Sequence, residues 1–373
     1  MKNNYIFLFS LLFVIVGSFA QEQKDINKIE QGHIDQNKFR QLKDVLATPN
    51  DQHTASGAPG SQYSQQKVDY VMDIRLEEST NKIYGNEKIT YHNNSKDELN
   101  YLWVQLDQNM RADDSKTPLV KSTGASEFIT PEKFQSTYMK ENKGFGFKVE
   151  KVESNGIPLS YFINSTMMRI NLPKPLASGG TFKFSIQWNY KINDINKDGG
   201  RSGLESFPDG NNNYTIAQFF PRLAVYNNVE GWQNMQFWGR SEWALEFGDY
   251  EVNITVPADH IVDATGVLQN EKDVLTKEQR KRWKNAKTSY KTPVFIVTQA
   301  EAEKTEKGRA TNTKTWKFKA QRVRDFAFAS SRKYIWDAMA TNINGKTVMA
   351  VSLYPKEGNP LWEEHSTRAV APT

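Results

Sequence analysis

The chain has 373 residues, with 48 basic and 43 acidic side chains and a formal net charge of +5. The two signs are mixed along the sequence, which is typical of a solvated surface and excludes the basic stripe of a nucleic-acid-binding protein. There is no cysteine, so disulfides, thiol nucleophiles and thiolate metal sites are excluded. The 21 Phe, 15 Tyr and 9 Trp supply the large core that such a protein needs.

The first 20 residues have the features of a secretory signal peptide. Lys2 is followed by an apolar run over residues 5–16 and by a small-x-small cleavage pattern that ends at Ala20. The run is shorter than the ~20 residues that a membrane-spanning helix needs. We expect cleavage after Ala20, export to the periplasm or the medium, and no membrane span in the mature chain. An uncleaved membrane anchor is the alternative.

Residues 21–66 are polar and poor in aromatic side chains, and we expect them to form an arm or linker. A short helix is predicted over residues 38–46. Glycine and proline between residues 55 and 61 break any regular structure there.

Beyond Val68 the apolar residues alternate with polar ones, the pattern of strands with one buried face. Residues 68–77 and 81–91 predict an antiparallel hairpin with a turn at Asn81. The clearest strand covers residues 181–191, and others are predicted over 251–257 and 316–320. Helices are predicted over 131–140, 276–286 and 359–370, and the glycine-rich stretch 193–213 is predicted to be a long surface loop.

Many short strands and few helices predict a mainly β protein. We expect a large antiparallel β-sandwich or saddle domain with few short helices over residues 67–340.

No catalytic or metal-binding motif is found in the sequence. The five histidines lie 20 or more residues apart, so no two share the i, i+4 spacing of a helical zinc site. There is no G-x-S-x-G nucleophile elbow and no phosphate-binding loop. We therefore predict no catalytic residue, no metal ligand and no cofactor within this chain.

Aromatic side chains are concentrated between Tyr214 and Trp243, in the segment that contains Gln218, Phe219 and Phe220. Such a cluster can be ordinary core. It can also line a groove in which flat rings hold a ligand and a few polar groups orient it. The sequence alone does not decide between ordinary core and a ligand-binding groove.

Several segments, taken in order, resemble the N-terminal domain of the alanyl aminopeptidase (gluzincin) family of zinc metallopeptidases. They are the hairpin 68–91, the Gln-containing segment 217–226, the F-x-D-Y-x-V-x-I-x-x-P-like strand 246–257, the A-x-G-like strand end 263–266 and the D-F-A-x-A-like strand 324–330. The order and spacing of the segments agree over roughly residues 67–370.

The resemblance implies a β saddle that covers the active site of the next domain and helps to bind the free amine of a peptide substrate. It makes Gln218 the expected acceptor for the ammonium group, with Phe219 and Phe220 as neighbouring substrate-binding residues, because hydrogen bonds to a charged donor are strong. Phe220 departs from the family pattern, in which many relatives carry Glu or Gln at that position.

The catalytic domain of that family carries G-x-M-E-N and H-E-x-x-H, which provide zinc ligands and the group that activates water. Neither motif occurs here, and residues 341–373 resemble only the start of that domain. We expect zinc in the full-length enzyme and none in this chain, and we favour an incomplete sequence over a protein that naturally lacks catalysis.

Two hypotheses result from the sequence. In the first, the chain is the substrate-end-binding part of an exported zinc aminopeptidase, inactive alone, and its partners are a peptide substrate and its own missing catalytic domain. In the second, it is a non-catalytic β-sandwich module for binding or adhesion at the cell envelope, with the aromatic residues of 219–243 as its platform.

Overall fold

The computed structural model describes residues 49–120, 128–138, 142–239 and 244–371. The chain divides into two compact units, residues 1–63 and 64–373, and all helices and strands named below belong to the second. In the first unit, residues 49–63 form turns and a bridge between His53 and Pro59. The predicted signal peptide and the helix predicted over 38–46 lie outside the described residues. Within the described ranges no helix is long and apolar enough to cross a membrane.

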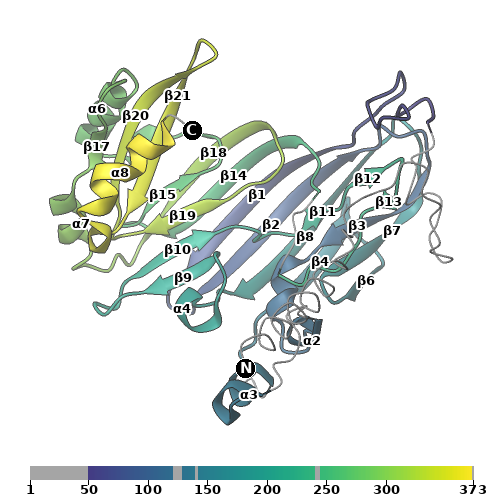
Figure 1. Cartoon of the computed structure of the whole chain (residues 1–373), viewed down its shortest axis with the longest axis horizontal. Coiled ribbons are helices and arrows are strands. Elements are labelled where there is room, and N and C mark those ends of the chain that lie inside the picture. Colours follow the sequence, from purple (N-terminus) through teal and green to yellow (C-terminus); the bar gives the residue numbers. More distant parts are fainter. Residues whose placement is uncertain (1–48, 121–127, 139–141, 240–243, 372–373) are drawn as a thin grey trace, which may run out of the picture. The chain divides into compact units, whose positions relative to one another are not determined.

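An eight-stranded sheet forms one layer of the second unit (Figure 1). Its strands, in spatial order, are β16 (Val267–Leu268), β18 (Thr313–Val323), β14 (Gly248–Pro257), β1 (Lys67–Glu77), β2 (Lys82–His92), β8 (Thr181–Lys191), β4 (Lys148–Ser154) and β5 (Ile157–Pro158). The predicted hairpin is β1–β2, which pairs antiparallel along its whole length and turns at Asn81, whose φ is 50°. Strand β1 also pairs parallel with β14, so the sheet is mixed where an antiparallel one was expected.

Smaller sheets complete the second unit. The first has the order β15 (Ile261–Ala264), β19 (Phe328–Ser331), β10 (Asn212–Ile216) and β9 (Gly203–Ser206); the second has the order β11 (Arg222–Leu223), β3 (Leu99–Gln105), β7 (Met167–Leu176) and β6 (Tyr161–Asn164). The third has the order β17 (Val294–Val297), β20 (Ile335–Ile343) and β21 (Lys346–Tyr354), and β12 (Tyr226–Asn227) pairs with β13 (Gly231–Trp232). The boundary predicted at residue 340 falls inside β20.

The stretch 193–213 is not the long loop that its composition predicted. It contains β9, the start of β10 and the short helix α4 (Ile195–Asp198), because β9 finds β10 as an antiparallel partner. These strands are short and largely polar, so they lack the apolar alternation by which longer strands are recognised.

Helices are short, as predicted. They are η2 (Asp107–Arg111), α2 (Thr117–Val120), α3 (Pro131–Tyr138), α5 (Glu271–Val274), α6 (Lys277–Ala286), α7 (Gln299–Thr305), η3 (Lys356–Gly358) and α8 (Leu361–Val370). Helix α6 begins at a capping box in which the side chains of Thr276 and Gln279 each accept a backbone N–H. Helix α8 lies along the hairpin β20–β21 (Figure 1).

The inner face of the large sheet and the smaller sheets share one hydrophobic core. Tyr70 of β1 meets Phe220 edge to face, with 5.3 Å between the ring centroids. Trp188 of β8 is fully buried against Gly85, where an added Cβ would lie 2.2 Å from the indole ring. The prediction of a mainly β protein with few short helices is confirmed.

Candidate functional site

Gln218 lies in the turn between β10 and β11 and has a left-handed backbone with φ of 52°. Its backbone carbonyl accepts a hydrogen bond of 2.9 Å from the Nε2 of Gln108. Its half-buried side-chain amide makes no hydrogen bond with the described residues. The backbone at Gln218 is therefore held in place while the amide keeps its donors and acceptor for another molecule.

Phe219 and Phe220 follow Gln218 but point into the core, and both rings are 0% exposed. Phe219 packs edge to face against Phe328 with a centroid distance of 5.3 Å, and Phe220 packs in the same way against Tyr70. These two rings are core, not the wall of a groove. Of the three residues predicted to bind substrate, only Gln218 reaches the surface in this conformation.

A buried charged group lies just beyond these rings. Arg222 donates through Nη2 to Asp107 Oδ2 at 2.5 Å and through Nη1 to Asp325 Oδ2 at 2.6 Å. The side chains of Arg222 and Asp107 are at most 2% exposed, whereas that of Asp325 is 37% exposed. Burial lowers the pKa of Arg222, but the two carboxylates outweigh burial and raise that pKa above its usual value.

This group was missed at the level of the sequence. Asp107 and Asp325 lie more than 100 residues away from Arg222 on either side, and no local motif joins them. One guanidinium faces two carboxylates, and burial raises the pKa of Asp325 although Arg222 opposes that rise.

A second arrangement has the residue types of a hydrolase triad. His260 Nδ1 lies 2.9 Å from Ser330 Oγ, and His260 Nε2 lies 3.7 Å from Glu78 Oε1. Both His260 and Ser330 are 0% exposed, so no substrate carbonyl can reach the hydroxyl. Burial lowers the pKa of His260, and the arrangement serves to join strands within the core.

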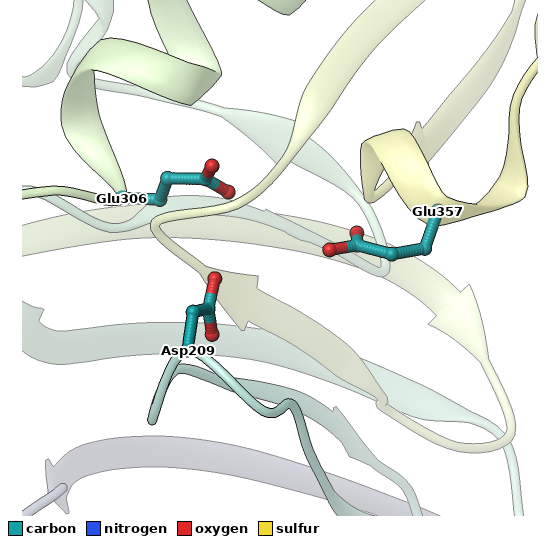
Figure 2. A group of neighbouring side chains, drawn as sticks. All are labelled: Asp209, Glu306 and Glu357. Atoms are coloured by element: carbon teal, nitrogen blue, oxygen red, sulfur yellow. The ribbon is translucent and has the colours of Figure 1, made fainter.

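Three carboxylates meet at the end of the β9–β10 turn in the arrangement of a cation site (Figure 2). Asp209, Glu306 and Glu357 place oxygen atoms within 4.8 Å of one another. Lys333 extends its Nζ to all three, at 2.6, 2.9 and 2.8 Å. Lys356 adds a second ammonium to Glu306.

These residues do not fit zinc. A catalytic zinc site takes three protein ligands, usually with histidine among them, and leaves a position for water. Here the donors are carboxylates alone, and the ammonium of Lys333 already lies among them. Burial raises the pKa of Asp209, but Lys333 and Asn211 lower it to about 2. Asp209 therefore stays ionised as a partner of lysine.

A shallow cavity of about 440 Å³ lies beside α8 and β20. Its lining includes two cationic side chains, Lys291 and Arg368, together with Tyr290 and Thr341. It contains none of the residues that the sequence predicted for substrate binding.

The sequence matches no protein-family model and no curated protein. Solved structures that resemble the chain include an M1 zinc metallopeptidase from Deinococcus radiodurans, at 12% identity over 80% of this chain and 49% of that one, with a TM-score of 0.41. A variant of that enzyme bound to a Tyr-Ser-Ala substrate is 12% identical over 82% of this chain and 52% of that one, with a TM-score of 0.43. The chain spans about half the length of these structures.

Proposed function

We propose that this chain is the N-terminal, substrate-end-binding part of an exported zinc aminopeptidase, which removes residues from the N-termini of peptides. Its role is to recognise the free amine of the substrate and to cover the active site. Zinc and the group that activates water are supplied by polypeptide beyond these residues. By itself the chain is expected to be inactive.

The observation that carries this proposal is the state of Gln218. Its backbone is held in a left-handed turn by Gln108, and its side-chain amide has no partner among the described residues. The amide oxygen can accept a hydrogen bond from an ammonium group, and such charge-assisted bonds are stronger than neutral ones.

The alternative of a β-sandwich binding module loses part of its support. Phe219 and Phe220, two members of the aromatic platform on which it rested, are buried in the core. No ligand can stack on either ring without opening the core.

Peptide binding tests the proposal. We would measure the fluorescence anisotropy of a C-terminally labelled pentapeptide with a free amine, and of the same peptide after N-terminal acetylation. The free peptide should bind about tenfold more tightly, because a charged hydrogen bond contributes roughly 1.5–3 kcal/mol. Gln218→Ala should remove this difference.

Gln321→Ala is the matched control, because Gln321 is an exposed amide on β18. It should leave the preference for the free amine intact. Equal binding of the two peptides to the unmodified chain would refute the role of Gln218. Chelator-sensitive turnover of an aminoacyl-p-nitroanilide by the purified chain would refute its inactivity.

A further inference from the structure

The solvent-facing side of the β11–β3–β7–β6 sheet carries an arginine among aromatic rings. Arg169 of β7 lies with its guanidinium carbon 3.9 Å from the ring centroid of Tyr101 and 5.9 Å from that of Phe162. Trp103 meets Phe162 edge to face at 5.8 Å, and Trp232 lies 6.5 Å from Tyr101. We call these five residues the arginine–aromatic face.

The alternation of the strands explains why this face points outward. On β3, Leu102 and Val104 are buried in the core, so Tyr101 and Trp103 project from the opposite side of the sheet. Trp103 lies opposite Arg169 in the pairing of β3 with β7, and Phe162 lies opposite Arg169 in the pairing of β6 with β7. The strand register therefore places Arg169, Tyr101, Trp103 and Phe162 on one face of the sheet.

Arg169 has no anionic partner within the part of the chain that the structure describes. Its Nε is buried without a hydrogen-bond acceptor, and the guanidinium forms no ion pair with any described carboxylate. The four strands of the sheet contain no acidic residue at all. A guanidinium held on a ring is preorganised for bidentate binding of a carboxylate, and the described residues supply none to Arg169.

We propose that the arginine–aromatic face is a docking surface for a polypeptide segment that presents an acidic side chain between apolar ones. The carboxylate pairs with Arg169, and the apolar neighbours pack against Trp103 and Phe162, whose side chain is 48% exposed. Aromatic residues and arginine are the residue types that contribute most to protein interfaces. The net charge of +5 disfavours a second copy of this chain and favours an acidic partner.

The ring geometry favours a polypeptide over a carbohydrate. Trp103 and Phe162 make an interplanar angle of 82°, so they form a notch for side chains and not a flat platform for sugar rings. On the adjoining edge strand β6, Phe162 belongs to this face, whereas Tyr161 and Ile163 alternate to the opposite side of the strand.

A peptide array tests this proposal. The probes are 12-residue peptides in which one Glu is placed among Leu, Val, Tyr and Trp in all orders, with a matched array that carries Gln instead of Glu. The best Glu peptides should bind the chain at least about tenfold more tightly than their Gln counterparts. Arg169→Gln should bring this ratio close to one.

Lys174→Gln is the control, since Lys174 is an exposed cation on the same strand and its loss changes the net charge equally. It should keep the preference for Glu. Trp103→Ala should weaken Glu and Gln peptides alike. Urea unfolding of each variant checks that the fold is intact.

Three results would overturn the proposal. They are equal binding of the Glu and Gln arrays, absence of binding by every peptide, and a Glu preference that survives Arg169→Gln. Arg169-dependent binding of an anionic oligosaccharide with no peptide binding would also refute it. Gln218→Ala should leave the array result unchanged, which separates this surface from the proposed amine site.

Discussion

Two arginines of one small sheet show opposite ways of placing a guanidinium. Arg222 on β11 is buried and bound by Asp107 and Asp325 at 2.5 and 2.6 Å. Arg169 on β7 stacks on Tyr101 and meets no carboxylate of the described chain. Arg222 joins distant segments within the fold, whereas the donors of Arg169 are used by no carboxylate of the described residues.

The largest effect is expected for Arg222→Gln. It leaves Asp107, which is 1% exposed, without its counter-charge. Breaking a buried ion pair in this way costs about 3–5 kcal/mol. Urea unfolding should show that loss in the free energy of unfolding, and a loss below about 1 kcal/mol would contradict a structural role for Arg222.

Lys333→Met should have the next largest effect, because Asp209, Glu306 and Glu357 would then face one another with only Lys356 nearby. We expect a loss of about 3 kcal/mol, at the low end for a buried pair since two of the carboxylates are partly exposed. Ca²⁺ binds oxygen ligands and should raise the melting temperature of this variant. The parent chain should not respond, and an equal response of both proteins would mean that Lys333 does not fill the site.

The carboxyl groups of Glu78 and Glu246 differ from each other as the guanidinium groups of Arg222 and Arg169 do. Burial raises the pKa of Glu78, but His260 and Arg332 outweigh burial and lower it to about 2. For Glu246 burial dominates and raises its pKa to about 7, although the backbone N–H of Tyr226 and the charge of Arg324 oppose the rise. The first group stabilises the fold in its charged form, and the second does so in its neutral form.

The pH dependence of stability tests this contrast at Glu246. Between the ordinary pKa of about 4.5 and the folded value of about 7, the folded chain binds more protons at this site than the unfolded chain does. The contribution of Glu246 to stability should therefore be present below pH 4.5 and fall as the pH rises to 7.

Glu246→Gln should lack this dependence and be more stable than the parent at pH 8, by roughly 1–3 kcal/mol. Unfolding curves at pH 5, 6, 7 and 8 measure the difference. If the difference in the free energy of unfolding between parent and variant does not change with pH, Glu246 titrates normally.

The smallest effect is expected for Arg169→Gln. Because Arg169 is only stacked on rings and pairs with no described carboxylate, its loss should change the free energy of unfolding by at most about 1 kcal/mol. Urea unfolding of the Arg169→Gln and Arg222→Gln variants, measured side by side, compares two arginines of one sheet directly. A loss as large as that of Arg222→Gln would mean that Arg169 supports the fold.

Strands with one buried face were predictable. Residues 181–191 alternate along their whole length, and β8 has those bounds. The parallel pairing of Tyr70 with Tyr250 was not predictable, since it joins residues 180 positions apart and nothing local specifies it. Strand β9 was missed because its pairing with β10, and not its composition, makes it a strand.

The candidate site was predictable only in part. The resemblance to a family indicated Gln218, whose amide has no partner among the described residues, and its role in binding stays a prediction. The aromatic density beside it did not distinguish core from groove, because burial of Phe219 and Phe220 depends on rings from distant strands such as those of Phe328 and Tyr70. The charge partners of Arg222 were missed for the same reason.

The central position of β1 affects how the chain folds. As synthesis proceeds from the N-terminus, β1 and β2 can pair early, since only a short turn separates them. The other edge of β1 stays open until β14, which ends at Pro257, has been made. Closing a contact over so long a loop is slow, and an open apolar strand is a target for aggregation. The edge of β1 that pairs with β14 therefore stays exposed in the nascent chain throughout that interval.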